Sequence, residues 1–128
     1  MEHSQSHDSL MKEAEAHLKT LFENSQQSIY LFLDDSHKIC NENFAHLLGY
    51  KSPDEWSKVK GSFTQKFVDE SSQEKLVSAY QKGMEDLVGS KIEVEWKTAS
   101  ASKVKTEVIL TPFFFNDHVF ALHFITKL

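Results

Sequence analysis

Apolar side chains recur at two different periods along this chain, and the change of period separates helical from extended segments. Near the N-terminus the apolar residues follow one another at intervals of three and four, as on one face of a helix: Met11, Ala14, Leu18 and Leu21, with Phe22 beside them. After Lys91 apolar and polar residues alternate singly, which is typical of a strand with one buried face. The pattern therefore predicts a helical start and an extended end.

The N-terminal helix is expected to follow a polar leader. Residues 1–7 predict a disordered leader, and Asp8 or Ser9 offers a side-chain oxygen that can cap a helix over residues 8–24. This helix is too short to form a stable coiled coil by itself. We therefore expect it to pack on its own domain, which comprises residues 25–128, on a second copy of the chain, or on both.

Start and stop signals divide the rest of the chain into short elements. Residues 28–33 and 38–40 favour strands, and the turn formers between them predict a hairpin. Capping residues then predict four helices, which begin at Asn41, Ser52, Ser62 and Ser71, the last of them long and stopping at Gly89. Three strands follow, and Asn116 and Asp117 form a tight connection between the last two, residues 103–115 and 118–126.

This order predicts an α+β fold: a five-stranded antiparallel sheet with central short helices and one long helix, preceded by the N-terminal amphipathic helix. The last strand is apolar on both faces, so both need a cover, and the central helices can cover only one. The N-terminal helix or a second subunit must cover the other. The candidate residues for a homodimer interface are Met11, Ala14, Leu18, Leu21, Phe22, Phe120, Leu122 and Phe124.

The segment Asn41–Tyr50 resembles a known family signature. Its pattern Asn-x-x-Phe-x-x-Leu-Leu-Gly-Tyr, followed by Ser-Pro-Asp-Glu-Trp at residues 52–56, is similar to the signature of PAS domains, and the element order agrees. The resemblance implies a sensory module that dimerises through a helix before the core and holds a small ligand between sheet and helices. We expect the input part of a histidine kinase or regulator, without enzymatic activity of its own. The second hypothesis is a domain whose ligand cavity is the main function.

Several aromatic residues are candidates for lining a ligand pocket, although the same side chains would equally fill a core. The candidates are Phe44, Trp56, Phe63, Phe67, Tyr80 and Trp96, with His123 as a polar group. The resemblance also bears on cofactors. Flavin photosensors of the family need a cysteine in the third short helix, but residues 61–68 contain none, and haem-binding members take an axial histidine from the long helix, where residues 70–88 contain none. Neither cofactor is expected, and the actual cofactor stays unknown.

Composition narrows the partners and the location. The chain has 19 acidic and 14 basic residues, all of the latter lysine, and a net charge of −5, so nucleic acid is not expected as a partner. A lone cysteine, Cys40, and the lack of an export signal predict a cytoplasmic location. The longest apolar stretch, residues 109–115, is too short to span a bilayer, so no membrane contact is expected.

Catalytic and metal-binding motifs are also missing from the sequence. The seven histidines show no strong metal-ligand spacing, and a single cysteine cannot build a thiolate zinc site. No nucleophile elbow or phosphate-binding loop occurs either. We therefore expect no metal site and no catalytic residues.

Overall fold

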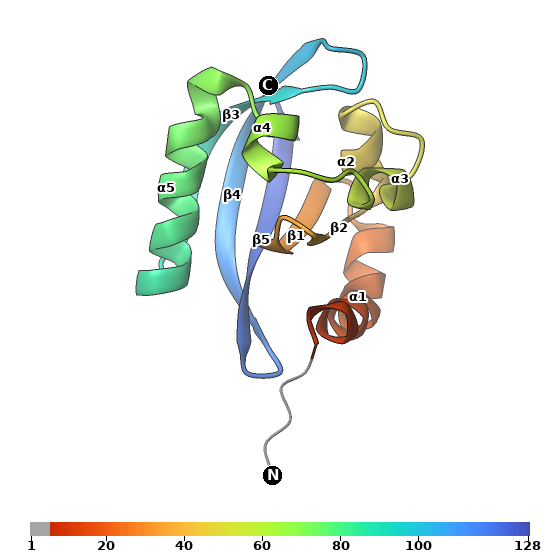
Figure 1. Cartoon of the computed structure of the whole chain (residues 1–128), viewed down its shortest axis with the longest axis vertical. Helices are drawn as coiled ribbons and strands as arrows, with labels where there is room; N and C mark the ends of the chain where they lie inside the picture. The colour runs from red at the N-terminus through yellow and green to blue at the C-terminus, as the bar shows by residue number, and fades with distance from the viewer. Residues whose placement is uncertain (1–5) are drawn as a thin grey trace.

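The C-terminal strand lies at the centre of the sheet, between the first and the fourth strands. The computed structural model describes residues 6–128 and has the strand order β2-β1-β5-β4-β3, with every neighbouring pair antiparallel (Figure 1). The strands are β1 (Ser28–Asp34), β2 (His37–Cys40), β3 (Ser90–Lys97), β4 (Lys103–Phe115) and β5 (His118–Lys127). The predicted five-stranded antiparallel sheet is therefore confirmed.

Helices cover both faces of this sheet. They are α1 (His7–Asn24), α2 (Glu42–Leu47), α3 (Pro53–Ser57), α4 (Phe63–Phe67) and α5 (Glu70–Asp86). Figure 1 shows α1 and α5 on opposite sides of the sheet, and side chains of α2, α3, α4 and α5 pack together on the face away from α1. Within residues 6–128, no helix combines the length and the apolar character needed to cross a bilayer.

The two faces carry two separate apolar clusters. The inner core lies between the sheet and α2–α5, and its largest fully buried side chains are Tyr30, Phe44, Trp56, Phe67 and Trp96. The outer core lies between the sheet and α1, and its fully buried members are Leu10, Ala14, Ile29, Leu31 and Phe120. Each large apolar side chain that is buried in this way contributes roughly 1.5–3 kcal/mol to the stability of the folded state.

Successive side chains of β5 point alternately into the inner and the outer core, which explains why the strand is apolar on both faces. Ala121 and Ile125 belong to the inner core, whereas Phe120 and Leu122 belong to the outer core. The N-terminal helix α1 covers the second face of the sheet. The sequence had left two alternatives for this role, the N-terminal helix and a second subunit.

Short-range signals place several elements where the sequence predicted them. The Asn41 side-chain oxygen accepts from the N–H of Phe44 at 3.0 Å and so caps α2. Ser52 caps α3 in the same manner, through the N–H of Glu55 at 3.1 Å. The β4–β5 connection turns at Asn116 and Asp117, both in the left-handed region with φ of 48° and 63°, as a two-residue hairpin requires.

The N-terminal helix begins earlier than expected. Its first residue is His7, and its cap is Ser6, whose side chain accepts from the N–H of Ser9 at 3.1 Å. The predicted caps, Asp8 and Ser9, therefore lie inside the helix. His7, which was expected in the leader of residues 1–7, therefore belongs to the helix, and the part of that expectation that concerns residues 1–5 lies outside the described part of the chain.

The long helix α5 also begins and ends at other residues than the sequence predicted. Its cap is Asp69 instead of Ser71, because the Asp69 carboxylate accepts from the N–H of Ser71 at 3.1 Å. It ends at Asp86, where Leu87 and not Gly89 adopts the left-handed conformation, with φ of 58°. Gly89 serves a different purpose: a Cβ there would lie 3.1 Å from the backbone oxygen of Leu110, so glycine permits a close approach to β4.

Candidate functional site

A cluster of stacked and edge-on rings surrounds Tyr30 on the inner face. The Tyr30 ring lies 4.8 Å from the ring of Phe44 and 5.7 Å from that of Trp96, measured between centroids. Trp56 and Phe67 continue the cluster with centroids 5.3 Å apart. All five residues are at most 1% exposed, so these rings fill the core.

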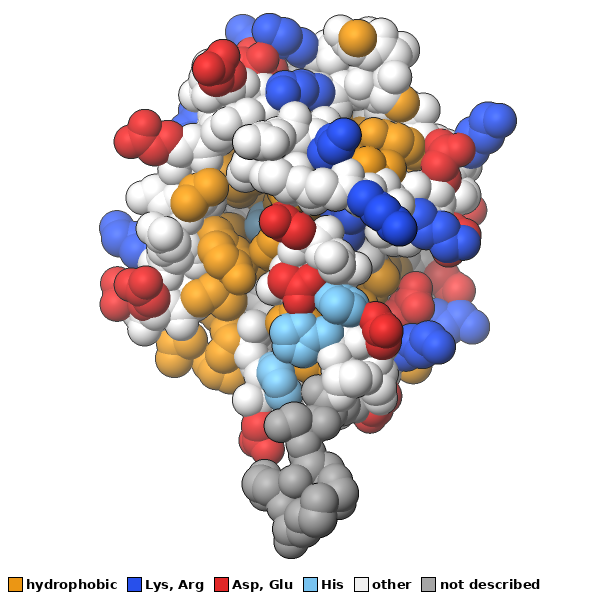
Figure 2. All heavy atoms as spheres, in the orientation of Figure 1, with side chains coloured by type: hydrophobic (Ala, Val, Ile, Leu, Met, Phe, Trp, Pro, Cys, Tyr) orange, Lys and Arg blue, Asp and Glu red, His pale blue; other side chains and the backbone are white. Residues whose placement is uncertain are grey.

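A cavity of about 290 Å³ opens beside this cluster, between the sheet and helices α4 and α5. Its walls are largely apolar, and Figure 2 shows apolar side chains exposed in the hollow beside α5. The apolar wall residues include Phe32, Phe63, Leu76 and Val77, and the polar ones include Asp35, Tyr80, Gln81 and His123. This combination of apolar walls and a few polar groups is typical of small-molecule sites.

His123 is a deeply buried polar residue at the cavity wall. It is 2% exposed, and its ring stacks on that of Tyr30 with centroids 3.8 Å apart and planes 8° from parallel. Burial lowers the pKa of His123 to about 3, although the backbone carbonyls of Tyr30 and Ala121 act in the opposite direction, so the imidazole is uncharged at neutral pH. Its Nδ1 has no hydrogen-bond partner among the described residues.

The structure therefore divides the predicted pocket residues into two groups. Three of them line the cavity, namely Phe63, Tyr80 and His123. The other four, Phe44, Trp56, Phe67 and Trp96, lie in the inner core and away from the cavity wall. Trp96 is also fully engaged there, since its Nε1 donates to the hydroxyl oxygen of Thr106 at 2.7 Å.

The sequence indicated a turn at Asp35 and a strand at Lys38, but not the long-range contacts that these two side chains make in the structure. Asp35, expected as a turn former, accepts from the N–H of Phe63 at 3.0 Å and so holds the start of α4 at the cavity wall. Lys38 is 3% exposed, and its Nζ donates to the carbonyl oxygen of Val59 at 2.9 Å and lies 5.5 Å from the ring centre of Trp56. Burial lowers the pKa of Lys38. No signal in the sequence indicates this long-range contact.

The candidates for the dimer interface are mostly covered by their own chain. Five of them are buried between α1 and the sheet: Met11, Ala14, Leu18, Phe120 and Leu122. Of the remaining three, Leu21 is 38% exposed, and Phe22 and Phe124 are half-buried. Homodimerisation stays a prediction, and these three are the candidates that the fold leaves accessible.

A larger groove of about 670 Å³ runs between α1 and α2. Exposed charged side chains of α1 form much of its wall, among them Lys12, Glu15 and Lys19. Cys40 also borders this groove, but burial raises the pKa of its thiol far above the ordinary range, so the reactive thiolate is suppressed. The smaller cavity is the better candidate site, because it has a buried polar group without a partner.

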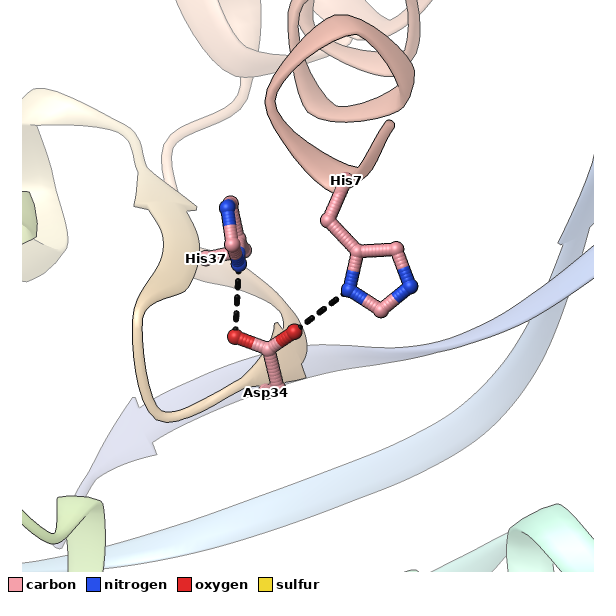
Figure 3. A group of neighbouring side chains, drawn as sticks. All are labelled: His7, Asp34 and His37. Atoms are coloured by element: carbon pink, nitrogen blue, oxygen red, sulfur yellow. Dashed lines mark hydrogen bonds and ion pairs between the residues drawn. The ribbon is translucent and has the colours of Figure 1, made fainter. Parts of the chain in front are cut away.

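One group of side chains has the composition of a metal site, although the spacing of the histidines along the chain predicted none. His7 from α1, Asp34 from the end of β1 and His37 from the start of β2 meet at one corner of the fold, and we call them the His–Asp cluster (Figure 3). The Asp34 carboxylate bridges the two histidines, with one oxygen 2.6 Å from Nδ1 of His7 and the other 2.7 Å from Nδ1 of His37. The docking of α1 brings these residues together.

Comparison with known proteins identifies the fold. No protein-family model and no curated protein matches the sequence. The PAS domain of an HTR-like protein from Haloarcula marismortui is 22% identical, covers 92% of this chain and 94% of its own, and has a TM-score of 0.64. A PAS domain from a two-component sensor histidine kinase is 13% identical over 90% of this chain and 99% of its own, with a TM-score of 0.67. The Rhodobacter sphaeroides LOV protein is 11% identical over 91% of this chain and 68% of its own, with a TM-score of 0.70. The chain therefore has the PAS fold, as its sequence signature predicted.

Proposed function

We propose that this domain is a sensory module that binds a small uncharged molecule in the cavity between the sheet and α4–α5. The observation that carries the proposal is His123, a buried side chain at the cavity wall whose Nδ1 has no partner in the described protein. An unpaired buried polar group costs roughly 1–3 kcal/mol. A ligand that supplies the missing hydrogen bond recovers this energy. The similar fold of a PAS domain from a sensor histidine kinase supports a sensory role.

The cavity also limits the chemistry of the ligand. A neutral imidazole offers one donor and one acceptor, so His123 suits a hydroxyl, carbonyl or amide group. The carboxylate of Asp35 at the wall and the lack of charge on His123 disfavour a ligand anion. A volume of about 290 Å³ lies at the small end of ligand sites. The expected ligand is therefore small, largely apolar and equipped with one hydrogen-bonding group.

The sheet provides the route from the cavity to α1. Tyr30 and His123 are cross-strand partners on the cavity side. The next pair along the same strands, Leu31 and Leu122, lies in the outer core under α1. Because both pairs belong to the same two strands, a ligand that shifts the β5 backbone at His123 also shifts the surface on which α1 is docked, and in this proposal α1 passes the change to a partner.

The wider setting belongs to the same proposal. In this proposal, the domain is the input part of a histidine kinase or regulator in the cytoplasm. Two copies form a homodimer through the accessible apolar residues Leu21, Phe22 and Phe124. No catalytic role is assigned to the domain itself.

Ligand binding can be tested with one blocked cavity and one matched control. Val77 is 39% exposed and lines the cavity, so Val77→Trp places an indole into its opening. Val88 is 49% exposed and lies outside the cavity lining, so Val88→Trp adds the same group elsewhere. Native mass spectrometry of freshly purified protein would detect a ligand that co-purifies. Thermal-shift measurements against a library of small uncharged molecules would detect binders.

We expect at least one compound that stabilises the wild type and Val88→Trp but fails to stabilise Val77→Trp. His123→Phe, which keeps an aromatic ring but removes the nitrogen atoms, should weaken binding of the same compound by roughly tenfold, the equivalent of one hydrogen bond. A wild type that carries no additional mass and is stabilised by no compound would contradict the proposal. Equal stabilisation of the two tryptophan variants would do so too.

A further inference from the structure

The three side chains of the His–Asp cluster form a donor set for a metal ion. Their potential ligand atoms all lie within 4.8 Å of one another. In a tetrahedral site with metal–ligand bonds of about 2.0–2.2 Å, the ligand atoms lie roughly 3.3 Å apart. Adjustments of about 1 Å in the side chains would therefore bring these atoms to a common ion. We propose that His7, Asp34 and His37 bind a divalent first-row transition metal ion, with Zn²⁺ as the first candidate.

The donor types determine which ions suit the site. Two imidazole nitrogens and one carboxylate favour Zn²⁺ and its neighbours Co²⁺, Ni²⁺ and Cu²⁺. Mg²⁺ and Ca²⁺ prefer ligand sets made of oxygen atoms alone. The cluster is only partly buried, and a water molecule can complete the coordination.

Asp8 is not one of the three proposed ligands, but its contact with His37 supports the assignment. Its carboxylate lies 2.6 Å from Nε2 of His37, the ring nitrogen that the metal does not use. Metal-bound histidines generally donate their second ring N–H to such a carboxylate, which fixes the orientation of the ring. Asp8 and Asp34 together also balance the two charges of the ion, which matters because the positive end of the α1 dipole lies at the same place.

The three ligands come from two separate parts of the fold, so a bound ion would link these parts. His7 is the first residue of α1, whereas Asp34 and His37 flank the β1–β2 turn. A bound ion therefore fastens the first turn of α1 to the sheet and strengthens its docking on the outer core. Binding itself does not depend on the proposed ligand cavity, and the two proposals can fail separately.

Titration of the untagged full chain tests the site directly. We expect isothermal titration calorimetry to show one Zn²⁺ per chain, and Co²⁺ to give the visible absorption bands of a tetrahedral nitrogen–oxygen site. His7→Gln, Asp34→Asn and His37→Gln should each lower the affinity for Zn²⁺ by more than tenfold, and Asp8→Asn by roughly tenfold, because it weakens the hydrogen bond that orients the His37 ring. Zn²⁺ should raise the melting temperature of the wild type, and a chelator should reverse the effect.

Two control variants leave the three ligands intact. His46→Gln changes an exposed histidine in α2, and His3→Ala changes a histidine near the chain amino group, which can itself bind metal ions. Both should retain the wild-type affinity, and circular dichroism checks that every variant is folded. The proposal is overturned if the folded wild type binds neither Zn²⁺ nor Co²⁺ stoichiometrically. It is also overturned if the double variant His7→Gln/His37→Gln still binds, or if His3→Ala abolishes binding.

Discussion

Leu31 and Leu122 are paired across β1 and β5 beneath α1, and their chain neighbours Tyr30 and His123 are paired on the opposite face at the cavity. Because consecutive side chains of a strand point to opposite faces, a shift of either strand changes both contacts at once. The central strands thus connect the candidate ligand site to the N-terminal helix without any intervening layer.

Removal of residues 1–24 should make the domain self-associate. Without α1, the apolar side chains of Ile29, Leu31, Phe120 and Leu122 become exposed on one face of the sheet, and such a patch favours association. Size-exclusion chromatography with light scattering should give a larger mass per particle for this truncated chain than for a control that lacks only residues 1–5. If both proteins have the same oligomeric state, the outer core does not require its helix. The same measurement on the full chain tests the predicted homodimer.

Acidification should destabilise the domain through His123. The pKa of this buried histidine is lowered from 6.5 to about 3, so below pH 6.5 the unfolded chain takes up a proton that the folded chain does not. The contribution of the uncharged His123 to the free energy of unfolding is fully present above pH 6.5. It is lost as the pH falls towards 3, at up to about 1.4 kcal/mol per pH unit. Urea unfolding at pH 7, 6 and 5 should show a smaller loss for His123→Gln than for the wild type. The exposed-site control His46→Gln should keep the wild-type slope.

Asn41→Ala should cost far more stability than a cap usually does. The Asn41 side-chain oxygen accepts from the N–H groups of both Ile29 and Phe44 at 3.0 Å, and its Nδ2 donates to the carbonyl oxygen of Gln27 at 2.8 Å. The substitution leaves buried N–H groups unpaired and should lower the free energy of unfolding by roughly 2–4 kcal/mol. Asn43→Ala is the matched control, since Asn43 is exposed and water can replace its bonds. Similar losses for the two variants in chemical denaturation would contradict this expectation.

Lys38→Met should destabilise the segment between α3 and α4. The substitution keeps most of the side-chain volume but removes the ammonium group that binds the carbonyl oxygens of Ser57 and Val59. We expect a loss of roughly 1–3 kcal/mol in the free energy of unfolding. Lys58→Met, at a side chain that is 74% exposed, should change it by at most about 0.5 kcal/mol. A loss at Lys38 no larger than at Lys58 would show that the buried ammonium group contributes no net stability.

Elements whose signals involve neighbours in the chain could be predicted from the sequence. The cap at Asn41 and the turn at Asn116 and Asp117 depend on bonds and backbone angles within a few residues. The ends of α5 were predicted less well, because competing caps lie close together there. Asp69 rather than Ser71 starts the helix, and Gly89 is needed for its close approach to β4 and not for the helix stop.

The sequence by itself determined the order of the elements, the PAS signature and the need for a cover on each face of β5. The tertiary structure alone decided that α1 provides the second cover, that Phe63, Tyr80 and His123 line a cavity while Phe44 and Trp96 fill the core, and that His7 meets Asp34 and His37. The physical reason is the range of the interactions involved. Hydrophobic periodicity and capping are properties of local sequence, whereas the cavity and the His–Asp cluster arise only where distant segments pack.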